Sequence, residues 1–112
     1  MTQAGTRRNL YKHFMNSSIA SNENMAAARN FVEEGRSCWL SGDLVHAEEN
    51  LNQALALVHD DGEAHWLLGE VMMASARTED AIDCFQLAVH FSPKLAIAQL
   101  ALANALLARG AY

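Results

Sequence analysis

The 112-residue chain has one proline, two cysteines and no long run of apolar residues. A membrane-spanning helix needs about 20 consecutive apolar residues, so the sequence predicts no segment that inserts into a membrane. No apolar stretch follows Arg7 and Arg8, which argues against a secretory signal. Cys38 and Cys84 lack the spacing of metal ligands, and we expect two reduced, buried thiols in a cytoplasmic protein.

Motifs that carry catalysis are also missing. The sequence has no glycine-rich phosphate loop and no signature of a cysteine or serine nucleophile paired with histidine. We therefore expect that the protein is not an enzyme and needs no cofactor. The segment HDDGEAH, residues 59–65, gathers two imidazoles and three carboxylates, which are metal-binding groups. Because no His-x₃-His or cysteine pair accompanies it, we interpret this segment as a turn whose acids cap the next helix, and we expect no metal site.

Charge is distributed unevenly along the chain. Residues 1–20 hold three basic residues and no acid, whereas the rest holds all 13 acids and gives the protein a net charge of −5. This balance argues against nucleic-acid binding, for which a basic surface is typical. The basic N-terminal arm, residues 1–20, is predicted to form a short amphipathic helix or a flexible segment. We expect it to contact the acidic body of the chain or to stay in water.

The sequence after the arm repeats with a period of 34 residues. The units span residues 28–61, 62–95 and, incompletely, 96–112. In this register Gly35 aligns with Gly69, and Ala103 takes their place in the third unit. Glycine within a helix costs about 1 kcal/mol relative to alanine. We infer that each unit forms two antiparallel helices, whose backbones approach closely because a side chain is missing there.

The second helix of each unit carries residues that suit this close approach. Ala47 and Ala81 supply a small surface, and Leu51 and Phe85 fill the space one turn further on. Burial of such apolar surface contributes about 25 cal/mol per Å², which offsets the cost of the glycine.

The boundaries of the predicted helices follow from capping residues and from the single proline. The predicted helices cover about residues 29–40, 44–58, 63–75, 79–91 and 95–109. Ser21 or Asn22 could cap the first of them, which would then begin several residues early and run through Met25 and the alanines. Asp43 and Thr78 are expected to cap the second helix of their units, and Pro93 to end one helix and start the next.

These features together resemble the tetratricopeptide repeat family, whose unit of 34 residues folds as a helix–turn–helix. The resemblance covers residues 28–112 and rests on the glycine, alanine and large apolar positions and on Pro93. Two positions depart from the family pattern, since His65 replaces a tryptophan and His59 replaces a proline. Residues 21–112 are therefore interpreted as one all-α domain of stacked helical repeats, for which the resemblance implies a right-handed α-α superhelix.

The resemblance implies a protein-interaction module, a scaffold or adaptor whose first helices line a concave groove. Such a groove binds a peptide or a helix of another protein. Carried over position by position, the groove residues are Arg29, Val32, Arg36, Trp39, Glu63, Trp66, Glu70, Met73, Ile97, Leu100, Asn104 and Leu107. Some family members bind the C-terminal carboxylate of heat-shock chaperones through a lysine and asparagines. Those positions hold Val32, Arg36 and Leu67 here, so we expect no carboxylate clamp.

The chemistry of the groove residues favours an apolar ligand such as an amphipathic helix, because Trp39, Trp66 and Met73 are among them. The arginines and glutamates of the groove would then fix the ligand's orientation. Both tryptophans could instead pack within the stack of repeats. An alternative function is self-association, or a regulatory or substrate-presenting role within a longer enzyme or assembly.

The last predicted helix, residues 95–109, has no acid, and Arg109 is its only charge. A first helix expects cover from the preceding unit and from its own second helix. The third unit has no second helix, which would expose Leu102 and Leu106 as an apolar patch. The chain could belong to a longer array, or the N-terminal segment or a second copy could cover this patch. We expect a homodimer with this helix in the interface.

Overall fold

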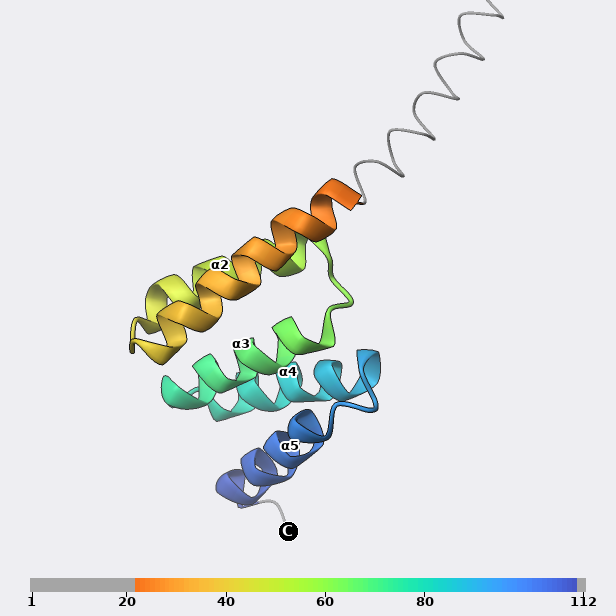
Figure 1. Ribbon diagram of the computed structural model, residues 1–112. Coiled ribbons are helices and arrows are strands. Elements are labelled where there is room, and N and C mark those ends of the chain that lie inside the picture. Colours follow the sequence, from red (N-terminus) through yellow and green to blue (C-terminus); the bar gives the residue numbers. More distant parts are fainter. Residues whose placement is uncertain (1–21, 111–112) are drawn as a thin grey trace, which may run out of the picture.

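The computed structural model describes residues 22–110, and the regular structure in that range is entirely helical (Figure 1). The first helix covers residues 22–40. The helices that follow are α2 (Leu44–Leu57), α3 (Gly62–Ala74), α4 (Thr78–Phe91) and α5 (Ala96–Arg109). The predicted all-α arrangement of helical repeats is confirmed. The basic arm, residues 1–20, lies outside the described residues.

Successive helices pack against one another along the stack. Figure 1 shows the helix over residues 22–40, α3 and α5 following one another down the molecule, with α2 beside the first of them and α4 beside α3. Contacts join α2 to α3, α3 to α4 and α4 to α5, and a smaller contact joins α3 to α5. Helices of this length are marginal in water on their own, so burial between neighbours stabilises each of them.

Gly35 and Gly69 lie where the two helices of a unit come closest. A Cβ atom added to Gly35 would lie 2.8 Å from Cγ of Leu51, and one added to Gly69 would overlap the ring of Phe85. Leu51 and Phe85 are among the largest fully buried side chains of the described residues. The predicted close approach is therefore confirmed, and the absent side chain makes room for a large apolar residue of the second helix.

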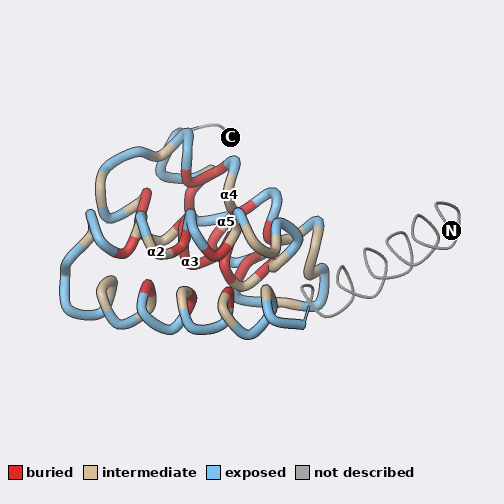
Figure 2. The backbone as a smooth tube through the Cα atoms, turned by 90° about the horizontal axis from the view of Figure 1, so that it is seen from above, coloured by how far each residue is buried: buried red, intermediate tan, exposed pale blue. Residues whose placement is uncertain are grey.

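The outer side of the first helix differs from the equivalent side of α3. Three residues of α3 on this side are fully buried, namely Ala64, Leu67 and Val71. The equivalent positions one repeat earlier are exposed and hold Asn30, Glu33 and Ser37. Figure 2 shows the first helix with its exposed side turned outward and its buried residues turned toward the other helices. The described stack therefore begins with a polar surface.

Aspartate side chains cap two of the helices. Asp43 precedes α2, and its side chain accepts a hydrogen bond from the backbone N–H three residues later, at 3.2 Å, as predicted. Asp61 caps α3 in the same way and at the same distance. The predicted cap at Thr78 is wrong. Thr78 is the first residue of α4, and Arg77 occupies the cap position without a side-chain capping bond.

Two other boundaries bear on the sequence prediction. The first helix already includes residue 22, so its predicted start several residues before residue 29 is confirmed. Pro93 lies in the turn after α4, but α5 begins only at Ala96, so the prediction that Pro93 starts this helix is wrong. Within residues 22–110, no helix has both the length and the apolar character needed to cross a membrane.

Replacement of Gly69 tests the close approach of α3 and α4. We expect Gly69→Ala to lower the free energy of unfolding by about 1–3 kcal/mol, since its Cβ overlaps Phe85 and overpacking outweighs the better helix propensity of alanine. Gly69→Leu should lower the melting temperature by several degrees or more, measured by circular dichroism. Ala56→Leu, at an exposed position of α2, is the control. An unchanged melting temperature for Gly69→Leu would contradict the packing argument.

Candidate functional site

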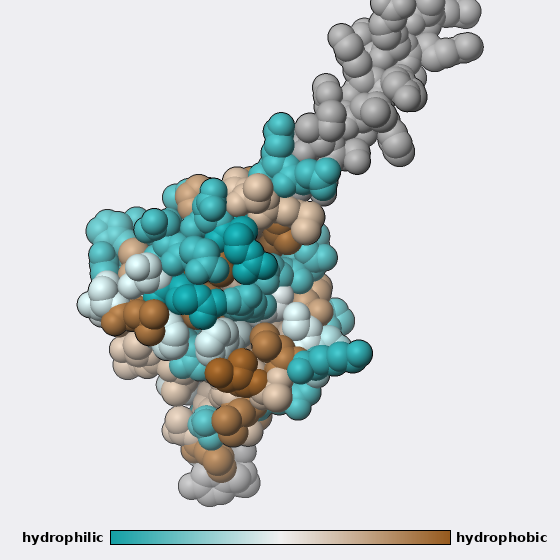
Figure 3. Space-filling view, viewed as in Figure 1, coloured by the Kyte–Doolittle hydropathy of each residue, from teal (hydrophilic) through white to brown (hydrophobic). Residues whose placement is uncertain are grey.

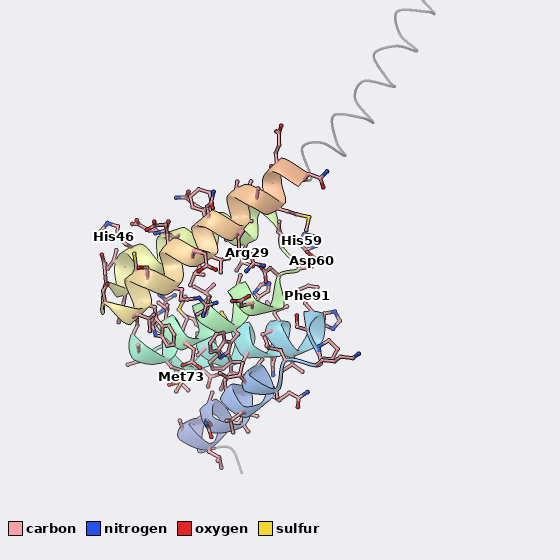
Figure 4. All side chains as sticks on the ribbon, in the orientation of Figure 1. Arg29, His46, His59, Asp60, Met73 and Phe91 are labelled. Atoms are coloured by element: carbon pink, nitrogen blue, oxygen red, sulfur yellow. The ribbon has the colours of Figure 1, made fainter. Side chains whose placement is uncertain are left out.

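The predicted groove residues come from the helix over residues 22–40, α3 and α5. Most of these predicted residues remain exposed or partly exposed. We call this exposed subset the lining face. Its members are Arg29, Arg36, Trp39, Glu63, Glu70, Met73, Ile97, Leu100, Asn104 and Leu107. Figure 4 labels two of them, Arg29 on the first helix and Met73 on α3. All three units contribute exposed or partly exposed side chains to this set.

Val32 does not belong to this surface, and its prediction as a groove residue is wrong. Its exposure is 0%, and the residues at the equivalent positions of the next two units are Trp66, exposed by 9%, and Leu100, exposed by 61%. Exposure at this position thus rises along the stack. The most exposed of the three residues lies on α5, the last helix of the described residues.

The two tryptophans pack against each other. The ring centroids of Trp39 and Trp66 lie 6.1 Å apart in an edge-to-face arrangement. Trp66 belongs to the core, and its Nε1 atom is inaccessible to solvent without a hydrogen-bond partner of normal geometry among the described residues. Trp39 remains partly exposed. For Trp66, packing within the repeats is the interpretation that the structure supports, so this residue is no accessible anchor for a ligand.

Four charged side chains form an ion cluster between the first helix and α3. Arg36 donates a hydrogen bond to Glu63, and Arg29 lies 3.5 Å from the same carboxylate. Glu33 lies 3.9 Å from Arg29 and 3.8 Å from Arg36. The two positive and two negative charges balance. We predicted Arg29, Arg36 and Glu63 as charges that orient a ligand, but here they bind one another across the repeat boundary.

Glu70 is the exception among the charges of the lining face. Its side chain is partly buried, and no cation pairs with it in the part of the chain that the structure describes. Burial raises the pKa of the Glu70 carboxyl above its usual value of 4.5, and the neighbouring Trp66 indole partly opposes this rise. A carboxylate at this position lacks the compensation that the ion cluster gives to Glu63.

The segment of residues 59–65 is occupied with structural contacts. Asp61 caps α3, and Nε2 of His65 lies 2.8 Å from the carbonyl oxygen of His59. The buried His65 ring also stacks on Phe91, with 5.6 Å between ring centroids. Within residues 22–110, no group of three or more His, Cys, Asp and Glu side chains is arranged to hold a metal ion. The capping role that we predicted for the acids of this turn is confirmed at Asp61.

Cys38 and Cys84 are free and partly buried. Burial, above all, raises the pKa of the Cys84 thiol to about 11. A thiol with such a pKa stays protonated near neutral pH and is a poor nucleophile. Cys84 therefore has the properties of a packing residue.

Sequence reasoning missed the ion cluster as a unit, although the signal was present. Arg29 and Glu63 occupy equivalent positions of adjacent first helices, and they carry opposite charges.

Comparison of this chain with protein-family models and with curated proteins finds no match. Function must therefore be inferred from the chemistry of the lining face itself.

The ion cluster can be tested by a double-mutant cycle. We expect a coupling of about 0.5–1 kcal/mol between Arg36 and Glu63, because both side chains are partly buried. Urea unfolding of Arg36→Gln, Glu63→Gln and the double variant measures it. The more exposed pair Arg109–Glu79, at 3.3 Å, is the control and should show a coupling close to zero. Strictly additive effects at positions 36 and 63 would contradict the cluster.

The raised pKa of Glu70 predicts that replacing this residue with an uncharged one stabilises the fold at neutral pH. The folded chain holds this proton more tightly than the unfolded chain, so ionisation of Glu70 destabilises the fold as pH rises past 4.5. We expect Glu70→Gln to raise the free energy of unfolding at pH 7 and to change it little at pH 3, measured by urea titration at both values. Glu34→Gln, at an exposed position of the first helix, should give no comparable gain. A destabilised Glu70→Gln variant at pH 7 would contradict this assignment.

Proposed function

We propose that the chain is an interaction module of the tetratricopeptide-repeat type, whose lining face binds a helical or extended segment of another protein. One observation carries this proposal. The lining face combines a partly buried carboxylate without a cation, that of Glu70, with apolar side chains that remain in contact with water. Both features cost free energy in the free chain, and a ligand that covers them relieves both.

The apolar part of the lining face lies on α3 and α5. Met73 is partly exposed, whereas Ile97 and Leu100 are exposed by 48% and 61%. Figure 3 shows hydrophobic surface gathered over the lower part of the molecule, where α3 and α5 lie, and hydrophilic surface above it. Isolated exposed apolar residues are ordinary, but a group on adjacent helices is typical of a binding surface.

The charges of the lining face define the chemistry of the ligand. The ion cluster is already balanced, so it contributes a polar border and little net attraction. Glu70 calls for a lysine or arginine, because a cation would compensate a carboxylate that burial disfavours. The ligand that this surface suits best is an amphipathic segment with apolar anchors at helical spacing and one basic residue beside them.

Selection from a displayed library of amphipathic peptides of about 20 residues tests this function. We expect the full chain to enrich peptides that combine apolar anchors with a basic residue, and Glu70→Gln to remove the preference for the basic residue. Met73→Asp should weaken the enriched peptides about tenfold or more, which corresponds to about 1.4 kcal/mol.

Leu40→Asp is the matched control, because Leu40 is exposed by 72% at the end of the first helix and lies outside the lining face. This variant should keep the affinity of the unchanged chain. Two results would count against the proposal: no enrichment of any peptide class, or enriched peptides that bind Met73→Asp as tightly as the unchanged chain.

A further inference from the structure

Helix α5 is packed on one side and open on the other. Its buried side consists of alanines, with exposures of 0% for Ala98, 8% for Ala101 and 0% for Ala105, and the helix contacts α4 and α3. The opposite side carries Leu100 and Leu107, which are exposed by 61% and 60%. Large apolar side chains exposed together on one side of a helix are typical of a surface that a partner covers.

Beside the open side, α5 carries Leu102 and Leu106, which are partly buried. Leu102 and Leu106 are equivalent to Leu68 and Met72 of α3, whose exposures are 7% and 5%. Ala103 is equivalent to Gly69, the point where α3 and α4 approach most closely. In α3 this side is buried within the unit, whereas no other helix within residues 22–110 takes the corresponding place beside α5.

The open side of α5 has the pattern of a helix-crossing site. Ala103, exposed and small, lies at its centre. With 3.6 residues per turn, Leu100 and Leu107 flank Ala103 on one side, and Leu102 and Leu106 flank it on the other. Small residues between rows of larger ones let two helices approach and interdigitate.

The charge of this side restricts its partner. Helix α5 holds no acid, and its one charged residue, Arg109, already pairs with Glu79 of α4 at 3.3 Å. The basic N-terminal arm would bring cations to a surface without carboxylates, which disfavours that occupant. The partner of suitable chemistry is another uncharged helix with a small central residue and leucines on both sides. Helix α5 itself meets this description.

We propose that α5 of a second copy covers the open side of α5, that the two helices cross at Ala103 about a twofold axis, and that this contact competes with the ligand of the lining face for Leu100 and Leu107. Such an interface is isologous, so both copies bury the same leucines and every contact occurs twice. Two uncharged surfaces meet without like-charge repulsion.

The oligomeric state of the full chain tests this interface. We expect sedimentation analysis between about 1 and 100 µM to show a monomer–dimer equilibrium. Leu100→Glu combined with Leu107→Glu should weaken self-association about 100-fold or more, since four carboxylates would then face an apolar seam. Both leucines are exposed, so these changes should leave the helical circular dichroism spectrum intact. Leu40→Glu combined with Val45→Glu is the matched control, because these positions are exposed by 72% and 66% outside α5.

A crosslink locates the crossing point. In a chain with Cys38→Ala and Cys84→Ala, we expect a short bismaleimide to join two copies through Ala103→Cys but not through Leu40→Cys. A monomer at every concentration would overturn the proposal and would leave another protein or the N-terminal arm as the occupant. A dimer that persists with glutamates at positions 100 and 107, or one that the control pair also dissociates, would overturn it equally.

Discussion

The structure depends on one steric requirement, the contact between a glycine on the first helix of a unit and a large apolar side chain on the second. At Gly35 the partner is Leu51, and at Gly69 it is Phe85. Each contact sets the distance between two helices without using a hydrogen bond or a charge. Since protein interiors are packed as densely as organic crystals, a side chain at either glycine would displace the second helix. The following unit packs on that helix, so its position would change as well.

The close approach of the two helices in a unit also affects which side chains of the first helix remain exposed. With the second helices behind them, the first helices present one side each to the lining face, where the ion cluster joins two units. The cluster satisfies its own charges, whereas Glu70 beside it depends on what binds. In the function proposed above, recognition depends on this one uncompensated charge and on the apolar side chains of the lining face.

Local patterns in the sequence were sufficient to predict the helices, their pairing and the role of the glycines, because these depend on periodicity and residue size within one unit. The errors arose where a distant neighbour decides the outcome. Val32 was assigned to the groove, but the following unit buries it. Thr78 resembles a capping residue, yet α4 includes it as its first residue. The partners of Arg36 and the environment of Glu70 depend on how adjacent units stack, which spacing along one unit does not determine.

The two ends of the described stack are chemically unlike, and this difference limits the assemblies that the chain can form. The outer side of the first helix presents Asn30, Glu33 and Ser37, whereas the open side of α5 presents leucines. A head-to-tail contact would remove the polar side chains of Asn30, Glu33 and Ser37 from water and place them against leucines. A contact of one end with the other generates filaments, whereas a contact of like with like closes after two copies. The polar side of the first helix therefore disfavours filament growth through α5.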